Sequence, residues 1–582
     1  MRFSLKGEME KILLLLIILN FCFLSVLAAP LIDFTNPTPN DDFITTNTSV
    51  EINISISEAN LGSLIYNWNT TNFSLYDGSL LAFFNLNNNS KIGDSSSKVI
   101  DSSIYNRHAG FPIFNDFEYG VRRWVARDGN WVAPARDCTT STSGSCSVKT
   151  TTTTTAAGSI YIDNTASTYP RDNLNIEFDY KCESGIKWGV MFLDAGVSWG
   201  CIQGSGTSNC GSASFVVKGA FSPAITCDNT WRHANYSVNW GAGTVSYPII
   251  GDWDGANTAN KWLWFDNFSI STSSAVYNSG KYEIGLSFDG TDDHISADGF
   301  SEIGTVNQPY SFTGWFNVAT GETNGDILFS EAVTGWCLPP VSLVNSKVRG
   351  YSWVNPTGTS TVTGTTTISS GEWYFFANTW DPTNGLNIYV NGQLEGTTAQ
   401  ANYLASGGSN TIWIGGVNSA YSGCAGYIGP FNGTIDEVSV WNKSLSASEV
   451  YQLYVSNLQK FNSTQWYLYV NQSKNATTGL NLGLYNYQTF ATNSSGSLSS
   501  TEQRTIDIST SICPSSKRNW NINMKDNLLI NSLCNITGYN VTFSGTGNFT
   551  INNTFYFNEM NNLSSGMTIW IKPNGILYSG AN

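Results

Sequence analysis

The stretch GEWYFFANTWDPTNGLNIYVNGQLEG, residues 371–396, carries the pattern that decides the fold. Apolar and polar residues alternate through LNIYV, and Asn391-Gly392 supplies the positive φ angles of a tight hairpin turn. The same period of two, typical of half-buried strands, recurs elsewhere in the chain. Clear examples are residues 49–57, 174–180 and 540–552. The pattern predicts an all-β protein.

Length and composition agree with this prediction. A chain of 582 residues is too long for one hydrophobic core, so we expect several domains. Only 12% of the residues are charged, and the net charge of −15 excludes a nucleic-acid partner, which would require clustered Lys and Arg. Helical periodicity is confined to residues 444–458, where Ser444 or Ser446 can cap a short helix.

Residues 1–28 have the pattern of a secretory signal peptide. Basic residues precede an apolar run from Ile12 to Leu27, and the small residues Ala28 and Ala29 follow it. The run is short for a bilayer span of about 20 residues, so we predict cleavage, with a retained N-terminal anchor as the alternative. We expect no membrane span in the mature chain unless this segment is retained.

Cysteine usage also fits a secreted or cell-surface location. Of the 11 cysteines, only Cys22 lies in the signal segment, which leaves an even number for disulfides in an oxidising compartment. The predicted pairs are Cys337–Cys424, Cys513–Cys534, Cys138–Cys146, Cys201–Cys210 and Cys182–Cys227. About 18 Asn-x-Ser/Thr sequons mark surfaces available for glycosylation.

Four motifs resemble, in content and in order, the laminin-G-like (concanavalin A-like) jelly roll. They are LSFDGTDDHISADG (286–299), PYSFTGWFNVATGETNGDILFSE (309–331), the opening stretch at 371–396, and GTIDEVSVWNKSLSASEVYQLY (433–454). The resemblance implies a two-sheet sandwich. Phe312, Trp373 and Phe375 sit at strand spacing, and we expect them to fill its core rather than hold a ligand.

The jelly roll is interrupted in the sequence. Its first strand and turn resemble SLLAFFNLNNNSKIGDSSSKVIDSSIYNRHAG (79–110), and the familiar continuation resumes only at SGKYEIGLSFDG (279–290). We therefore assign residues 79–114 and 279–458 to one domain with an insert at 116–271.

Three pieces of the insert resemble strands of galactose-binding-like jelly rolls, as in carbohydrate-binding modules of families 4 and 9. They are DFEYG (116–120), ITCDNTWRHANYSVNW (225–240) and WLWFDNFSIS (262–271).

The flanking segments complete the proposed nesting. Residues 31–77 hold about three strands and residues 461–511 about four, whereas an immunoglobulin-like sandwich needs about seven. Neither segment can close a core alone, so we predict one discontinuous immunoglobulin-like domain. Residues 512–582 resemble the opening turns of a parallel β-helix, a short solenoid-like segment.

A search for catalytic patterns gives one weak candidate. Glu177, Asp179 and Glu183 approximate the paired-carboxylate motif of concanavalin-like glucanases, but the spacing of six exceeds that of the family and the motif lies in the insert. No nucleophile elbow, zinc-protease pair or phosphate loop occurs. We predict that the protein is not an enzyme.

Structural calcium is a candidate cofactor. Asp289 and Asp436 match acidic positions near the rim of laminin-G-like domains, where the alternative is that they cap turns. Glu118 and Asp266 match the calcium pair that the galactose-binding-like resemblance implies on neighbouring first and last strands.

Candidate glycan platforms are Trp188, Trp199 and Trp253, which lie in Gly-rich stretches of the insert. Trp231, Trp262 and Trp264 match core strands and are expected to pack inside. The leading hypothesis is a non-catalytic adhesion protein that binds glycans or other surface polymers. The alternatives are a structural surface-layer or stalk protein, and an accessory or catalytic part of a glycoside hydrolase system.

Overall fold

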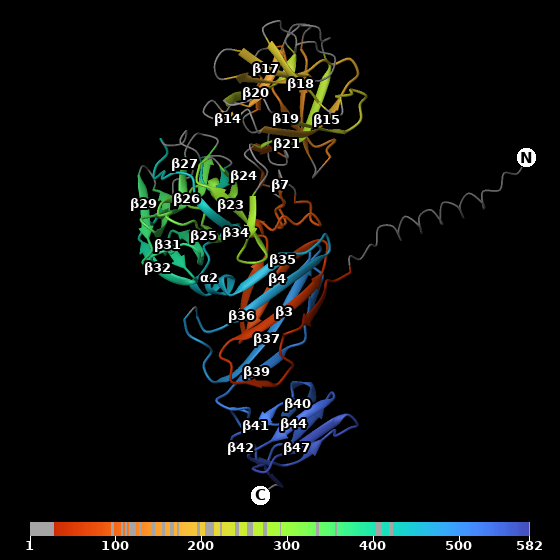
Figure 1. The fold of residues 1–582 in the computed structure, drawn as a ribbon, viewed down its shortest axis with the longest axis vertical. Coiled ribbons are helices and arrows are strands. Elements are labelled where there is room, and N and C mark those ends of the chain that lie inside the picture. Colours follow the sequence, from red (N-terminus) through yellow and green to blue (C-terminus); the bar gives the residue numbers. More distant parts are fainter. Residues whose placement is uncertain are drawn as a thin grey trace, which may run out of the picture. The chain divides into compact units, whose positions relative to one another are not determined.

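The protein is built almost entirely of β-strands, as predicted (Figure 1). The computed structural model describes residues 28–94, 98–105, 109–110, 113–115, 124–126, 130–142, 146–153, 158–162, 168–170, 174–194, 198–203, 215–221, 224–238, 244–252, 260–271, 276–291, 293–332, 337–354, 358–402, 410–417, 423–475 and 477–580. The chain divides into two compact units. The first comprises residues 1–77, 463–474 and 479–582, and the second residues 78–462 and 475–478.

The first unit contains a sandwich made from two distant segments. One sheet has the order β1-β3-β36, and the other the order β2-β39-β37-β4-β5, with β38 beside β37. The strands are β1 (Leu31–Thr35), β2 (Phe43–Thr45), β3 (Val50–Ser57), β4 (Leu61–Trp68), β5 (Thr71–Tyr76), β36 (Gln465–Gln472), β37 (Gly483–Asn493), β38 (Leu498–Ser500) and β39 (Arg504–Ile508). Strand β3 pairs with β36 along its whole length, and β4 pairs with β37. Residues about 400 positions apart in the sequence therefore share one core.

The C-terminal segment forms a short parallel β-solenoid. Its three sheets have the orders β40-β43-β46, β41-β44-β47 and β42-β45-β48, all with parallel pairing. The strands are β40 (Trp520–Asn523), β41 (Leu529–Ile530), β42 (Cys534–Asn535), β43 (Val541–Ser544), β44 (Gly547–Ile551), β45 (Thr554–Phe557), β46 (Met560–Asn561), β47 (Met567–Ile571) and β48 (Ile576–Ser579). The Cys513–Cys534 disulfide closes its first rung.

The sandwich covers the start of this solenoid. Ile44 of β2 packs in the same buried cluster as Trp520 of β40. The buried carboxylate of Asp507 accepts a hydrogen bond from the Arg518 guanidinium at 2.7 Å and another from the Ser515 backbone N–H at 2.7 Å. The solenoid core is thereby continuous with the sandwich core at this end.

The second unit contains the jelly roll. One sheet has the order β22-β23-β34-β25-β30-β31-β32 with β6 beside β34, and the other the order β29-β28-β27-β26-β33-β24-β8-β7. The strands are β6 (Leu80–Phe84), β7 (Lys98–Val99), β8 (Ala109–Gly110), β22 (Val276–Ser279), β23 (Ile284–Asp289), β24 (Ile295–Phe300), β25 (Tyr310–Val318), β26 (Gly325–Ala332), β27 (Cys337–Val344), β28 (Lys347–Trp353), β29 (Thr359–Thr363), β30 (Trp373–Asp381), β31 (Gly385–Val390), β32 (Gln393–Thr398), β33 (Asn410–Ile414) and β34 (Asn432–Trp441).

The hairpin turn and the helix cap that the sequence predicts both form in this domain. Asn391 and Gly392 have φ angles of 50° and 74°, and they connect β31 to β32 in a two-residue hairpin. Helix α2 (Ala447–Tyr454) begins after Ser446, which forms a capping box with Glu449. Of the two serines that the sequence offered as caps, Ser446 is the one used.

Of the three aromatic residues expected to fill the jelly-roll core, Phe312 and Phe375 are buried. Phe312 belongs to the main buried cluster, but Phe376 rather than Phe375 faces that cluster from β30. Phe375 lies on the opposite face, where its ring is 5.4 Å from that of Trp315 and 5.9 Å from that of Tyr454 in α2. Trp373, two residues earlier, is half-buried. Phe375 is buried on this second face because Tyr454 of α2 packs against it.

A buried polar network joins strand β6 to the rest of the jelly roll. The Asn85 amide donates to Glu437 Oε2 at 2.7 Å and to the Leu458 carbonyl at 3.0 Å. Next to it, Asp436 Oδ2 accepts the backbone N–H groups of Lys281 and Tyr282. These bonds tie the segment before the interruption to the segment that follows it.

A strap of residues 423–430 is fixed to the second sheet by one buried carboxylate. Asp326 Oδ2 accepts the backbone N–H groups of Ile428 and Gly429 at 3.0 and 3.2 Å. The Arg349 guanidinium donates to Ser342 Oγ at 3.1 Å and to the Gly426 carbonyl. The Cys337–Cys424 disulfide adds a covalent link. Burial raises the pKa of Asp326 to about 6.

This raised pKa predicts a specific pH dependence. Protonation of Asp326 favours the folded state, so its contribution to stability is full below pH 3.8, its unperturbed pKa, and is lost as the pH rises through about 6. In Asp326→Asn, which keeps an acceptor for both N–H groups, the gain in unfolding free energy between pH 8 and pH 5 should shrink by about 1.4 kcal/mol. Urea unfolding of both proteins at several pH values measures the difference. Parallel pH profiles would contradict the assignment.

The insert is a separate two-sheet sandwich within the second unit. One sheet has the order β10-β13-β20-β16-β17-β18 with β14 beside β20, and the other the order β11-β12-β21-β15-β19 with β9 beside β21. The strands are β9 (Ile113–Asn115), β10 (Trp124–Ala126), β11 (Ala135–Asp137), β12 (Ser147–Thr151), β13 (Gly158–Ile162), β14 (Thr168–Pro170), β15 (Leu174–Cys182), β16 (Gly189–Asp194), β17 (Ser198–Gln203), β18 (Phe215–Ala220), β19 (Arg232–Val238), β20 (Thr244–Asp252) and β21 (Trp262–Ser271). Phe178, Trp188 and Phe265 lie at the centre of its core.

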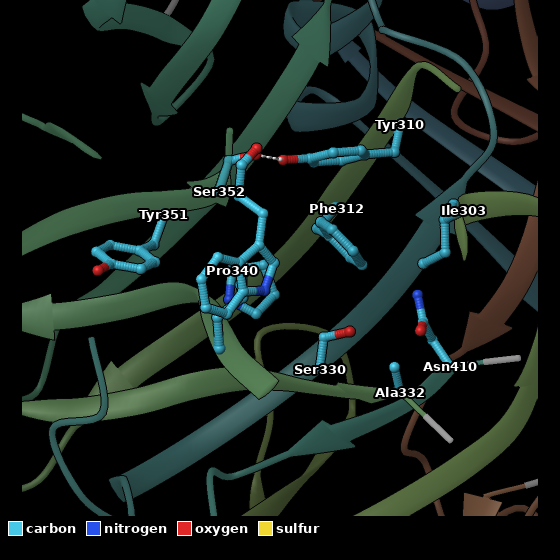
Figure 2. A pocket seen from close by; sticks show the side chains of 11 residues that line it. Ile303, Tyr310, Phe312, Ser330, Ala332, Pro340, Tyr351, Ser352 and Asn410 are labelled. Atoms are coloured by element: carbon cyan, nitrogen blue, oxygen red, sulfur yellow. Dashed lines mark hydrogen bonds between the residues drawn. The ribbon is translucent and has the colours of Figure 1, made fainter. Parts of the chain in front are cut away.

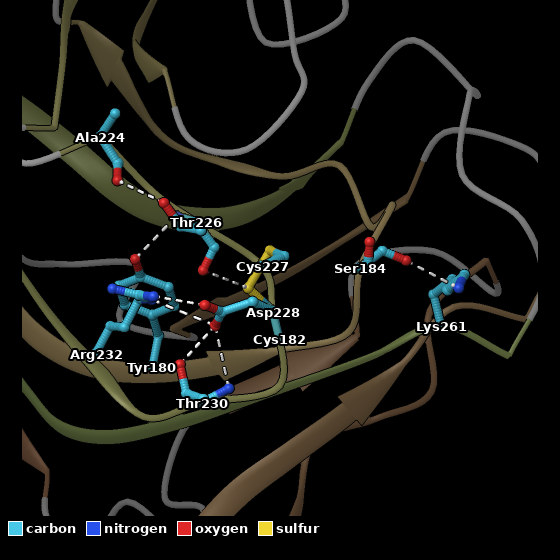
Figure 3. Close-up of a disulfide and its surroundings, with 10 residues drawn as sticks. All are labelled: Tyr180, Cys182, Ser184, Ala224, Thr226, Cys227, Asp228, Thr230, Arg232 and Lys261. Carbon is cyan, nitrogen blue, oxygen red and sulfur yellow. Dashed lines mark hydrogen bonds and ion pairs between the residues drawn. A yellow bond between two sulfur atoms is a disulfide. The ribbon is translucent and has the colours of Figure 1, made fainter.

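Four of the five expected disulfides are present between described residues. They are Cys138–Cys146, Cys182–Cys227, Cys337–Cys424 and Cys513–Cys534. Figure 3 shows the second, beside which Tyr180 Oη accepts the Thr226 N–H at 3.0 Å and Arg232 pairs with Asp228. Cys201 is also disulfide-bonded, whereas Cys210 lies outside the described residues.

Candidate functional site

A pocket opens at one end of the jelly roll, between its two sheets (Figure 2). It holds about 420 Å³ of space, counting its open mouth. Five strands and the 3-10 turn at Glu302–Gly304 contribute to its wall. The lining residues are Ile303, Tyr310, Phe312, Ser330, Ala332, Leu338, Pro340, Tyr351, Ser352, Trp353 and Asn410. We call this the rim pocket.

Strand alternation explains why these side chains converge. Ser330 and Ala332 are two residues apart on β26 and therefore share a face, and Ala332 is paired directly with Asn410 of β33. Tyr310 and Phe312 stand in the same relation on β25 of the opposite sheet. The pocket thus lies between the inner faces of both sheets, where a sandwich end is not filled by a core side chain.

The rim pocket is aromatic and uncharged. Four of its lining residues carry aromatic rings, and none of them is Asp, Glu, Lys, Arg or His. The hydroxyl of Tyr310 is 3.0 Å from Ser352 Oγ, which also accepts a hydrogen bond from the Gln400 amide at 3.1 Å. Pockets with apolar walls and a few fixed polar groups are typical small-ligand sites. The sequence analysis missed this site because its residues come from five separate strands.

Of the three expected glycan platforms, only Trp188 has a described side chain. Trp188 is fully buried and packs against Phe178, Tyr180 and Phe265, so it belongs to the core of the insert. The prediction was wrong because Trp188 stands at two-residue spacing from Val190 and Phe192, which belong to the same buried cluster. Trp199 lies in β17, but its side chain is outside the described part of the chain, as is Trp253.

Trp264, which was expected inside the insert, is buried but does not belong to the cluster between the two sheets. Trp264 is flanked by Lys149 and Lys181, whose Nζ atoms lie 4.5 and 5.3 Å from its ring centre, and its Nε1–H donates to Asp137 at 2.9 Å. Trp231, directly before β19, is half-buried, and its Nε1–H donates to Thr140 Oγ1 at 2.8 Å. The alternation in WLWFDNF places Leu263 and Phe265 inward and Trp264 outward. Trp264 is therefore buried, as expected, but outside the cluster between the two sheets.

The acidic residues of the weak catalytic candidate each contact a basic side chain. Glu177 and Asp179 both contact the imidazole of His233, at 3.3 and 2.9 Å, while Glu183 pairs with Lys261 at 2.7 Å. Thr142 and Asn267 donate further hydrogen bonds to Asp179. The carboxylates are thus occupied by neighbouring side chains of the same sheet.

The described residues do not assemble a calcium site in the jelly roll. Asp289 pairs with Asn432 in β34, whereas Asp436 lies four residues further along that strand, which separates the two by about 13 Å. Asp436 is buried and binds backbone N–H groups, and Asp289 accepts the Thr291 N–H in a turn. The turn-capping alternative therefore describes both residues. Across the described parts of the chain, no cluster of three or more His, Cys, Asp or Glu side chains could hold a metal ion.

The calcium pair of the insert stays a prediction. Asp266 is buried and accepts hydrogen bonds from Thr142 and Asn267, and Glu118 lies outside the described residues. If calcium binds there, adding it to chelator-treated protein should raise the melting temperature of the wild type but not of Glu118→Ala. Identical melting of the wild type with and without chelator would refute the site.

Part of the chain matches the model of one known protein family. Residues 289–451 match the model of the concanavalin A-like lectin/glucanases superfamily. This match confirms the laminin-G-like resemblance that the four motifs indicated. No curated protein sequence matches the chain significantly.

Several solved structures are similar to parts of the chain. Domain 4 of AbnA, a GH43 extracellular arabinanase from Geobacillus stearothermophilus in complex with arabinotriose, is 19% identical, covering 31% of this chain and 81% of that one with a TM-score of 0.21. The native heptameric SAP-like pentraxin from Limulus polyphemus is 18% identical, covering 29% and 80% with a TM-score of 0.23. The CBM22-1-CBM22-2 tandem domain of Xyn10C from Paenibacillus barcinonensis is 13% identical, covering 56% and 96% with a TM-score of 0.21. Since these similarities are low, the functional argument rests on the site.

Proposed function

We propose that this protein is a secreted or cell-surface adhesion protein that binds glycans through the rim pocket without cleaving them. The observation that carries the proposal is an uncharged, aromatic-lined pocket in a domain that matches the concanavalin A-like lectin/glucanases superfamily. Aromatic rings offer flat apolar surfaces to the C–H faces of sugars, and the hydroxyl of Ser330 offers a hydrogen bond.

Other features support the same proposal. Four disulfides in the described chain fit an oxidising compartment. No helix in the described ranges is long and apolar enough to cross a bilayer.

Two variants test the rim pocket as a glycan site. Trp353→Ala removes an aromatic wall, and Ser330→Phe fills the space with a ring. Each should lower glycan affinity at least about tenfold in a glycan array or in calorimetry, because the stacking surface or the space for the ligand is lost. Leu394→Ala, an exposed position on β32, serves as the matched control and should bind like the wild type.

The competing functions predict different results. A structural surface-layer protein would bind no glycan and would assemble with itself. A hydrolase would release sugar from a bound substrate, and Glu177→Gln would abolish that release. Unchanged glycan binding in both pocket variants, with intact thermal unfolding, would refute the rim pocket as the site.

A further inference from the structure

The chemistry of the rim pocket restricts the sugar that it can bind. Its wall has two polar positions separated by apolar surface. On one side Ser330 lies beside Ala332 and its strand partner Asn410, and on the other the Tyr310 and Ser352 hydroxyls contact each other (Figure 2). Leu338, Pro340 and the ring of Phe312 supply much of the surface between them.

A charged sugar substituent would be disfavoured in this environment. No lining residue carries a charge that could compensate a uronate carboxylate or a protonated amine. Burying either group without a partner costs several kcal/mol. A plain hydroxyl is also a poor occupant, because against Leu338 or Pro340 it would lose its hydrogen bonds to water.

An acetamido group fits both the apolar surface and the polar positions of the pocket wall. Its methyl group suits the apolar surface of Ala332, Leu338 and Pro340, while its amide N–H and C=O can exchange hydrogen bonds with Ser and Asn side chains. We propose that the rim pocket binds the N-acetyl group of a glycan built from 2-acetamido sugars. This inference rests on the proposed function and names its ligand class.

Three trisaccharides with the same β-1,4 backbone provide the test on the full-length protein. Chitotriose carries acetamido groups, its de-N-acetylated form carries protonated amines, and cellotriose carries hydroxyls. Calorimetry should show chitotriose binding at least about tenfold more tightly than either of the others, because only its substituent leaves no buried group unpaired.

Two variants connect that preference to the pocket. Ser330→Ala removes a hydrogen-bonding hydroxyl, and Ala332→Leu fills the space that the methyl group would take; each should reduce the preference for chitotriose at least about fivefold. Leu394→Ala should keep the preference. Thermal unfolding of each variant separates a binding defect from misfolding, and Ser330→Ala keeps the test decisive if Ala332→Leu does not fold.

The outcomes separate this inference from the proposed function. Equal affinity for chitotriose and cellotriose, with both lost in Trp353→Ala, would overturn the acetamido inference and leave glycan binding at the rim pocket intact. Binding that Trp353→Ala leaves unchanged, or no binding to any glycan, would overturn both.

Discussion

Replacing Trp188 with alanine is expected to lower the unfolding free energy of the inserted sandwich by about 3–5 kcal/mol. The side chain is fully buried, and its ring centre lies 5.9 Å from that of Phe178, 5.7 Å from that of Tyr180 and 5.6 Å from that of Phe265. Alanine would leave a large cavity between these rings, which cannot close because the strands that carry them are fixed by their ladders. A loss of this size would unfold a marginally stable domain.

Thermal and urea unfolding of the full-length protein, followed by near-UV circular dichroism, would measure the effect. Trp570→Ala is the control, since this tryptophan of the solenoid is 55% exposed and its removal should change stability by less than about 0.5 kcal/mol. Unchanged stability in Trp188→Ala together with lost glycan binding would contradict the core position and restore Trp188 as a platform.

The second large effect concerns the sandwich of the first unit. A shortened chain in which a flexible linker joins Asp77 directly to Ser463 should fold cooperatively, whereas a chain that ends at Asp77 should show no cooperative transition. In the structure, Ile52, Ile54 and Ile56 of β3 are fully buried, and β3 pairs with β36 from the distant segment. Without β36 and β37, this apolar face and the central edge of each sheet would be open to water.

Circular dichroism melting curves of the two shortened chains would show whether the sandwich needs the second segment to fold. The linker adds only a small closure cost, since that cost grows with the logarithm of loop length. Ile54→Asp in the linked chain is the matched variant and should abolish folding, because it buries an unpaired charge in the shared core. Cooperative unfolding of the chain that ends at Asp77 would show that the second segment is not needed.

Much of the fold could be read from local patterns in the sequence. The all-β class followed from the period of two, because alternating side chains dictate a half-buried strand wherever they occur. The hairpin at Asn391-Gly392 and the cap at Ser446 followed from backbone preferences of single residues. The described disulfides followed from cysteine spacing within each proposed domain.

The sequence was least informative about which face of a strand is buried. Phe375 and Phe376 are adjacent and equally apolar, yet only Phe376 faces the main core, because α2 covers the other side of β30. Trp188 was expected to be exposed and is buried for a related reason: alternation defines two faces of a strand but does not say which one meets the second sheet.

The sequence by itself determined the strands, the turns, the helix cap and the cysteine pairs, because each depends on residues close together in the chain or on a fixed local geometry. Only the tertiary structure decided the rest. It separated Asp289 from Asp436 along one strand pair, placed Asp326 under the strap, and gathered the rim pocket from five strands of two sheets. The physical reason is that pairing between distant strands sets the register, and the register determines which side chains meet across a sandwich.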